Sequence, residues 1–261
     1  MKFFSIFVLA GALVSAFLGG YFFPHHGVTA ASTTEKTVVK SHFTSATLPD
    51  FSTYTDVKLK KLDFFSFMLP RVKQANQLIL QERDWIKSLQ HKSDTFEQAQ
   101  MDRLLALAKK YKVKFQQPNE IIEELLIRID TVPASLVLAQ AANESAWATS
   151  RFAVQGNNLF GQWCYVKGCG LIPRSRGADQ HHEVARFKNI QQSIDSYMRN
   201  LNSQAAYTDL RDLRQDMRED NSTVSGLTLA KGLLKYSTRR EAYVEEIQAM
   251  IRQNRLAQYD K

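Results

Sequence analysis

From residue 57 to residue 114, apolar side chains recur mostly at steps of three and four residues. This spacing places them on one face of an α-helix and predicts helices rather than strands. We expect a first helix that contains Phe64 and Phe65 and continues past Pro70, and a second that ends near Tyr111. Aromatic residues in such a pattern are usually core, and neither helix carries a paired set of histidines or carboxylates for a metal.

A second run of helical pattern begins at Pro118, and its first segment, residues 120–132, is amphipathic. The segment that follows, as far as Ala148, consists mostly of alanine and other small residues, so neighbouring helices can approach it closely. Pro133 suits the first position of this helix, where the N–H that a proline lacks would be unsatisfied in any case. We expect this to be the buried central helix of the main domain.

One carboxylate, Glu144, lies towards the end of the predicted central helix. On a 3.6-residue period it shares a stripe with Val137, Gln140 and Ala141, so its carboxyl should have apolar neighbours. Burial disfavours the anion and raises the pKa, which is what a general acid working near neutral pH needs. A structural ion pair and a catalytic acid are both compatible with this position, and we favour the acid.

The N-terminal segment predicts export from the cytoplasm. Residues 3–23 contain no charge and follow Lys2. The apolar run is longer than the roughly 7–15 residues of a cleavable signal and close to the roughly 20 that span a bilayer, so residues 1–30 are a signal peptide or a signal anchor. Residues 31–56, rich in Ser and Thr, are expected to be a linker. We therefore expect a periplasmic or otherwise extracytoplasmic protein, either secreted or anchored in the inner membrane.

The formal net charge of +8 favours an anionic partner such as nucleic acid, acidic lipid or a wall polymer. The lysines and arginines are interspersed with acids, and no zinc-ligand array, RNP-like run or concentrated basic block is present. Nucleic acid is therefore not the expected partner.

The chain has two cysteines, Cys164 and Cys169, flanked by Gly168 and Gly170. Two cysteines cannot complete a structural zinc site, and a redox pair would favour the closer CxxC spacing. Outside the cytoplasm, a disulfide that shapes one hairpin is the simplest interpretation.

Two neighbouring motifs carry a resemblance to a known family. LAQAANESAWATSRFA (residues 138–153) and GNNLFG (156–161) resemble the catalytic motif and the following turn of the glucosaminidase family of peptidoglycan hydrolases. FKNIQQSIDSYMRNL, with Ser193 and Tyr197, and KYSTRREAYVEEI are similar to its later segments, so the likeness covers about residues 119–258. The N-terminal helices, WCYVKGCG and HHEVARF extend it to the Bax-like members of that family.

This resemblance implies a mainly helical, lysozyme-like domain over residues 118–261, with a small β-hairpin lobe after the catalytic helix. Residues 57–117 would be a helical appendage packed on it. The expected substrate is the glycan strand of peptidoglycan, cut at β-1,4 bonds after N-acetylglucosamine, with no cofactor. Glu144 matches the family's catalytic acid.

Glycoside hydrolysis usually needs a second carboxylate. The candidate is Glu183 in HHEVARF, with Asp179 as the runner-up. An ion pair of Glu183 with Arg186 or Arg174 is an equally good interpretation. The acetamido group of the substrate could also assist in place of a second carboxylate.

Six further residues are expected to bind substrate: Asn157, Asn158, Phe160, Gln162, Tyr236 and Tyr243. Trp163 could stack on a sugar ring, whereas a core role is at least as good an interpretation for Trp147. We reject a metal site at His181 and His182, because adjacent side chains point in different directions and no partner ligands stand at a suitable spacing.

Three functions are compatible with these features. The first is an endo-β-N-acetylglucosaminidase, the second a lytic transglycosylase on the same scaffold, and the third a wall-binding module without turnover.

Overall fold

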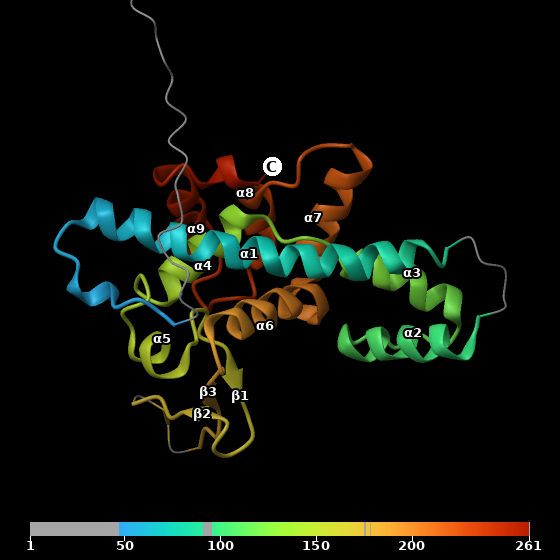
Figure 1. Ribbon diagram of the computed structural model, residues 1–261, viewed down its shortest axis with the longest axis horizontal. Coiled ribbons are helices and arrows are strands. Elements are labelled where there is room, and N and C mark those ends of the chain that lie inside the picture. Colours follow the sequence, from blue (N-terminus) through green and yellow to red (C-terminus); the bar gives the residue numbers. More distant parts are fainter. Residues whose placement is uncertain (1–46, 91–95, 175, 178, 261) are drawn as a thin grey trace, which may run out of the picture. The chain divides into compact units, whose positions relative to one another are not determined.

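The computed structural model describes residues 47–90, 96–174, 176–177 and 179–260 (Figure 1). They belong to one compact unit, Val39–Lys261. The predicted signal segment and most of the predicted linker lie outside the described residues. None of the described helices is both long and apolar enough to cross a bilayer.

The described chain is mainly helical with one small sheet, as the sequence predicts. The helices are α1 (Val57–Lys87), α2 (Gln98–Lys110), α3 (Pro118–Arg128), α4 (Ala134–Glu144), α5 (Arg151–Gly156), α6 (Ile190–Ser203), α7 (Thr208–Glu219), α8 (Gly226–Leu229) and α9 (Glu241–Gln253). The strands are β1 (Trp163–Cys164), β2 (Gly170–Leu171) and β3 (Glu183–Ala185). Short 3-10 helices cover Phe51–Thr53, Ala205–Tyr207, Ala230–Leu233 and Leu256–Tyr259.

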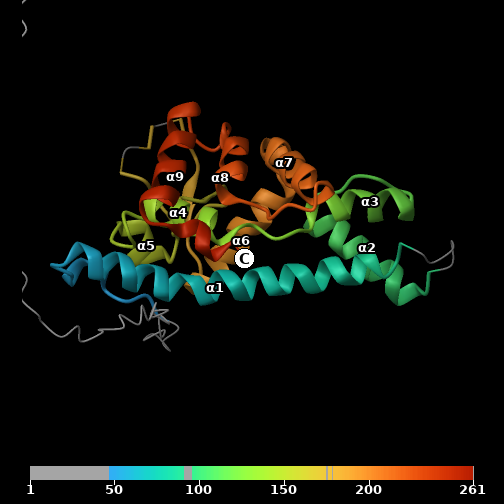
Figure 2. The same ribbon diagram turned by 90° about the horizontal axis from the view of Figure 1, so that it is seen from above.

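The predicted first helix is α1, which continues through Pro70. The Asp56 side chain caps its start by accepting the backbone N–H groups of Lys58 and Leu59 at 2.7 and 3.2 Å. Figure 2 shows α1 running along the helical body, where it packs against α3, α4 and α6. Its inner face supplies five of the large buried side chains of the core: Phe64, Phe67, Val72, Ile79 and Ile86.

The predicted central helix is α4, which packs against α1, α8 and α9 and is buried along most of its length. It begins one residue later than expected, because Pro133 has an extended ψ of 134° and is its N-cap. It also ends before Ala148, because the Ser145 hydroxyl donates to the Ala141 carbonyl and accepts the Ala148 N–H at 2.5 and 2.7 Å. Residues 146–148 turn through left-handed φ values of 50–63°. Glu144 is thus the last residue of the helix, at the point where the chain changes direction.

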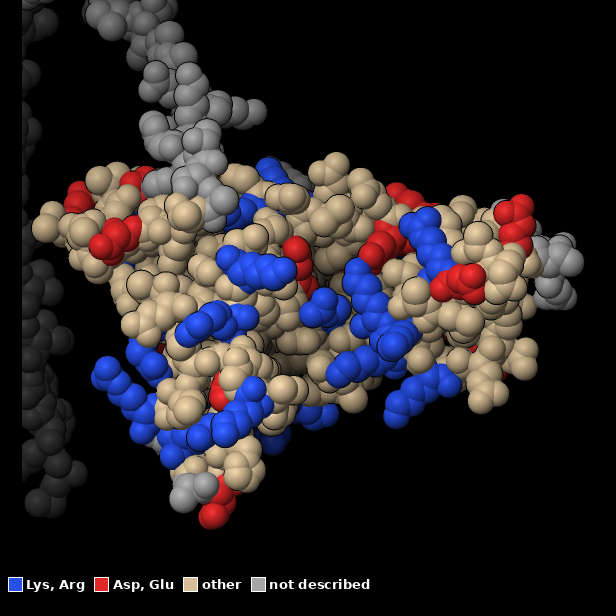
Figure 3. Space-filling view, turned by 60° about the horizontal axis from the view of Figure 1, so that its bottom comes forward, with Lys and Arg blue, Asp and Glu red and all other residues tan. Residues whose placement is uncertain are grey.

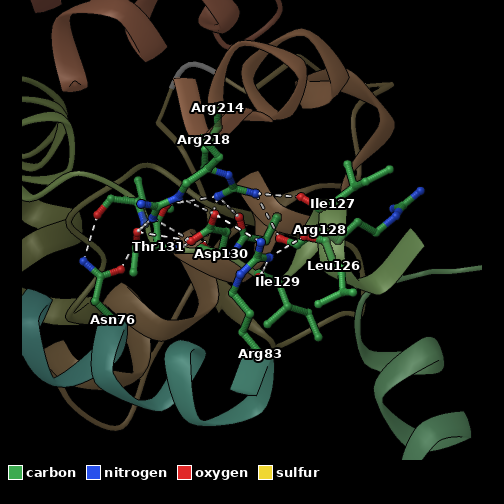
Figure 4. Close-up of polar contacts among 12 residues, drawn as sticks. Asn76, Arg83, Leu126, Ile127, Arg128, Ile129, Asp130, Thr131, Arg214 and Arg218 are labelled. Atoms are coloured by element: carbon green, nitrogen blue, oxygen red, sulfur yellow. Dashed lines mark hydrogen bonds and ion pairs between the residues drawn. The ribbon is translucent and has the colours of Figure 1, made fainter. Parts of the chain in front are cut away.

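Three arginines hold the connection between α3 and α4 (Figure 4). Arg214 of α7 is 1% exposed, and it donates to the backbone carbonyls of Ile127, Arg128, Asp130 and Thr131. Arg83 of α1 donates to the carbonyls of Leu126 and Ile129. Arg218 contacts the Asp130 carboxylate at 3.0 Å. These bonds satisfy carbonyls at the end of α3 and fix where α4 begins.

The sheet forms the β-lobe, which lies below α6 in Figure 1. Its strand order is β1–β3–β2, and β3 pairs antiparallel with both neighbours. The predicted disulfide is confirmed: Cys164 and Cys169 are bonded, with 6.2 Å between their Cα atoms. Gly170 is required opposite β3, because a Cβ there would lie 2.0 Å from the Val184 carbonyl oxygen.

Candidate active site

A cleft of about 710 Å³ opens at the C-terminal end of α4. Glu144 lines it together with the turn residues 160–162, β1, the C-terminal half of α6 and Tyr236. Another hollow, of about 760 Å³, contains the carboxylate of Asp260, but the backbone N–H groups of Ser135 and Gly226 and the Ser135 hydroxyl already bind that carboxylate. The cleft with Glu144 is therefore the candidate active site.

The Glu144 carboxyl is half-buried, with its two oxygens in different surroundings. Oε1 accepts a hydrogen bond from the Tyr243 hydroxyl at 2.7 Å. Oε2 lies near Gly161, since a Cβ atom added to that glycine would be 4.0 Å from it. Burial raises the pKa of Glu144, whereas hydrogen bonds from Tyr243 and Asn143 lower it. The negative charge of Glu246 raises the pKa further, and Arg239 opposes it. A carboxyl with a raised pKa retains a proton to higher pH, as a general acid must.

A chain of hydrogen bonds behind the cleft orients this carboxyl. The Tyr197 hydroxyl donates to Oε1 of Gln140, Nε2 of Gln140 donates to the Tyr243 oxygen at 2.8 Å, and Tyr243 donates to Glu144. Gln140 is fully buried. Because the single hydroxyl hydrogen of Tyr243 points to Oε1, a proton on Glu144 is carried by Oε2.

The two tyrosines in this chain of hydrogen bonds, Tyr197 and Tyr243, remain protonated. Burial, followed by the charge of Glu144, raises the pKa of Tyr243, and burial raises the pKa of Tyr197. Tyr236 stacks on Tyr243 with a ring-centroid distance of 5.2 Å and donates its hydroxyl to the Phe160 carbonyl at 2.8 Å. The segment before α9 is thereby tied to the turn that borders the cleft.

The Asn-rich turn is built by side-chain bonds to its own backbone. Asn157 ends α5 in the left-handed conformation, with φ 50°. Asn158 is buried; its Nδ2 donates to the carbonyls of Gln162 and Ala185, both at 2.9 Å. Phe160 stacks on Tyr197 at 3.9 Å. The turn therefore has one shape, fixed from within and from β3.

The predicted binding residues divide into two groups. Phe160, Gln162 and Tyr236 line the cleft with Glu144. Asn157, Asn158 and Tyr243 are not part of the cleft lining; they hold the turn and the acid in place, and direct contact of these three with substrate stays a prediction.

Glu183 lies in the β-lobe, at the start of β3, but its partners there are not those that the sequence suggested. Its two oxygens accept the backbone N–H groups of Gly168 and Gly170 at 2.9 and 2.7 Å. These bonds lower the pKa of Glu183 and leave it ionised. Among the described residues its hydrogen-bond partners are thus glycine amides rather than Arg186 or Arg174. Glu183 is not among the residues that line the cleft, and its catalytic role stays a prediction.

Asp179, the runner-up, is exposed in the β-lobe and is also outside the cleft lining. One grouping of potential metal ligands occurs in the described chain, namely Cys164, Cys169 and Glu183, but the disulfide occupies both sulfurs. His181 and His182 do not belong to it.

The two tryptophans near the motif have different surroundings. Trp147 packs edge-on against Phe64 and Phe65 of α1, with centroid distances of 5.5 and 5.4 Å, so it belongs to the core. Trp163 lines the cleft, is 58% exposed, and stacks on His182 at 3.9 Å. An exposed, supported aromatic face of this kind suits stacking on a sugar ring.

Comparison with known proteins identifies the family. The profile described as mannosyl-glycoprotein endo-beta-N-acetylglucosaminidase matches residues 119–256, more than half of the chain. The chain belongs to this glucosaminidase family. It is 33% identical over 213 residues to the protein bax of Escherichia coli, covering 80% of this chain and 75% of that protein. No solved structure matches the chain. Membership indicates a glycoside hydrolase-like enzyme that acts on a glycan.

Sequence reasoning missed several residues of this candidate site, among them Gln140 and Lys112. Gln140 appeared only as a neighbour of Glu144, although a glutamine in an otherwise apolar buried helix signals a polar partner. Lys112, from the connection between α2 and α3, also lines the cleft. No local signal marks Lys112, because its place depends on how α2 packs.

Proposed function

We propose that the protein is an endo-β-N-acetylglucosaminidase that hydrolyses β-1,4 bonds of peptidoglycan glycan strands, with Glu144 as the general acid. The observation that carries the proposal is the half-buried carboxyl of Glu144 beside the cleft, whose pKa is raised and whose Oε2 is the oxygen that Tyr243 does not bind. The family to which the chain belongs supports this choice of bond.

In the proposed reaction, Oε2 of Glu144 gives its proton to the glycosidic oxygen as the bond from that oxygen to C1 breaks. Among the described residues that line the cleft, Glu144 is the one carboxylate. This favours assistance by the substrate: the carbonyl oxygen of the 2-acetamido group bonds to C1 and forms an oxazolinium ion. Water then adds to C1 as Glu144 takes back a proton, which regenerates the acetamido group and leaves a reducing N-acetylglucosamine end.

The same lone acid also suits a lytic transglycosylase, the second candidate. In that reaction Glu144 protonates the glycosidic oxygen as its bond to C1 of a muramyl residue breaks. The C6 hydroxyl oxygen of the same residue bonds to C1 and its proton returns to Glu144, which leaves an anhydro-muramyl end without the use of water. The proposed hydrolase and this alternative share the acid and differ in the sugar whose C1 reacts.

The products distinguish these functions. Purified peptidoglycan is incubated with the protein, and the released fragments are examined by mass spectrometry. Reducing N-acetylglucosamine ends are expected; anhydro-muramyl ends would support the transglycosylase, and no release would support a binding module. Glu144→Gln should lose at least about a hundredfold in kcat, whereas the matched change Glu245→Gln, at an exposed residue of α9 outside the cleft, should not.

We also propose that residues 1–30 direct the enzyme out of the cytoplasm, because an uncharged apolar run follows Lys2. Cell fractionation tests the location, and sequencing the N-terminus of the mature protein tests whether the segment is a cleaved signal or a retained anchor. Full-length protein in the cytoplasmic fraction would contradict this.

A further inference from the structure

The described lining of the cleft contains two charged side chains, Glu144 and Lys112. Glu144 is accounted for by the proposed chemistry. Lys112 lies before the family match, which begins at residue 119, so nothing in that match assigns it a role.

Lys112 occupies a position where glycine is usual. It follows the C-cap of α2 with a left-handed φ of 59°. The N–H groups of Lys112 and Val113 donate to the carbonyls of Lys109 and Ala108 at 3.3 and 2.8 Å, the pattern of a Schellman motif. A residue with a Cβ atom is disfavoured in the left-handed conformation, so a lysine at this position costs conformational energy that a glycine would not.

Arg128 holds the backbone next to Lys112 close to the end of α6. Nη1 of Arg128 donates to the carbonyl of Tyr111, at the end of α2, and to that of Ser203, at the end of α6, at 3.0 and 2.7 Å. Arg128 is itself held by Glu124, with Nε to Oε1 at 2.5 Å. The chain at Lys112 is thus tied beside the part of α6 that lines the cleft.

The charge of Lys112 is available to a ligand. Its side chain is exposed, and within the described chain its ammonium makes no ion pair, whereas the nearby Lys110 is bound to Glu82. Lys and Arg outnumber Asp and Glu on the face shown in Figure 3, in keeping with the net charge of +8. An anionic strand would be drawn to a protein of this charge.

We propose that Lys112 binds a carboxylate of the glycan strand and so determines a preference for acidic over neutral glycans. This rests on the proposed function, because it names the substrate feature that the same cleft recognises. Muramyl units offer the carboxylate, either on the lactyl ether itself or on the peptide attached to it. A neutral N-acetylglucosamine oligomer offers none.

The test compares kcat and KM on three substrates: strands that carry peptides, strands stripped of peptides so that the lactyl carboxylate is free, and stripped strands whose lactyl carboxyl has been amidated. Lys112→Gly removes the charge while suiting the left-handed backbone, so its thermal midpoint should not fall. Lys112→Arg keeps the charge. Lys114→Ala removes an equal charge from an exposed lysine outside the cleft lining.

We expect Lys112→Gly to raise KM about threefold to fivefold on a carboxylate-bearing strand, as for one solvent-exposed ion pair, with kcat unchanged. Lys112→Arg should keep the KM of the wild type. About 0.5 M salt should remove the difference in KM between the wild type and Lys112→Gly. A rise on stripped strands identifies the lactyl carboxylate, and a rise confined to peptide-bearing strands identifies the peptide. An equal rise on amidated strands, an equal effect of Lys114→Ala, or no rise would overturn the proposal.

Failure of the proposed function gives a different result. If the protein is a transglycosylase, anhydro-muramyl ends appear and the same comparison of KM still tests Lys112. If it is a binding module, the wild-type protein cuts none of the three substrates, whatever residue stands at position 112. The role of Lys112 is then decided by the Kd of each strand, measured with and without Lys112→Gly in the Glu144→Gln background. The same threefold to fivefold loss of binding is expected for acidic strands alone, and an unchanged Kd would overturn it.

Discussion

Tyr243 donates its hydroxyl to Oε1 of Glu144, and this bond stabilises the carboxylate against the effect of burial. Tyr243→Phe removes the bond and leaves the carboxyl buried, so the pKa of Glu144 should rise further. A general acid must be protonated, so the alkaline limb of kcat/KM should move to higher pH. The pH profiles of wild type and variant test this.

The matched control for that comparison is Tyr259→Phe, which also removes one phenol oxygen but lies in the last 3-10 helix, outside the cleft lining. It should leave the profile in place. An alkaline limb that stays still or moves to lower pH in Tyr243→Phe would show that the bond does not set the proton affinity of Glu144.

At the scale of elements, Arg214 joins α7 to the carbonyls between α3 and α4. Arg214→Met should lower the free energy of unfolding by about 3–5 kcal/mol, because it leaves Asp130 with fewer counter-charges and several buried carbonyls without donors. Urea unfolding measures the loss. Arg252→Met, at an exposed residue of α9, should stay within about 0.5 kcal/mol of wild type; a similarly small change in Arg214→Met would contradict the structural role.

The β-lobe provides a test of the second carboxylate. Because both oxygens of Glu183 accept glycine amides, we expect Glu183→Gln to disturb the hairpin and lower the thermal midpoint. The loss in kcat should be less than about tenfold, well below that of Glu144→Gln. Measuring both quantities for both variants decides between the roles. A loss in kcat equal to that of Glu144→Gln, with an unchanged midpoint, would instead make Glu183 the second catalytic carboxylate.

The sequence predicted features that depend on residues close together in the chain better than features that depend on contacts between separate elements. The periodicity of α1 and the spacing of Cys164 and Cys169 depend on neighbouring residues, and both predictions are confirmed. The sequence predicted that α4 ends near Glu144, as it does, but it also counted residues 145–148 in the helix. The hydroxyl of Ser145 stops the helix before them by a bond that a small-residue pattern does not reveal. The partners of Glu183 and the place of Lys112 depend on contacts between elements distant in the sequence, so no pattern indicated them.

At the scale of the whole molecule, α1 lies outside the family match yet covers the core of the matched region. Its Asn76 exchanges two hydrogen bonds with the backbone of Val132, just before α4, at 2.9 and 3.0 Å. Its Arg83 binds the end of α3. The sequence-based division places α1 in an appendage, so the dependence of the catalytic part on α1 can be tested by truncation.

We expect a chain of residues 118–261 to lack a cooperative thermal transition and to bind a hydrophobic dye. Without α1, the apolar faces of α3, α4 and α6 are exposed, and each large side chain of α1 that packs on them contributes about 1.5–3 kcal/mol. A chain of residues 47–261 is the matched control and should unfold cooperatively and cut peptidoglycan. If residues 118–261 fold and cut as well as that longer chain, α1 is a dispensable appendage, and the conformation of Glu144 at the end of α4 is maintained without it.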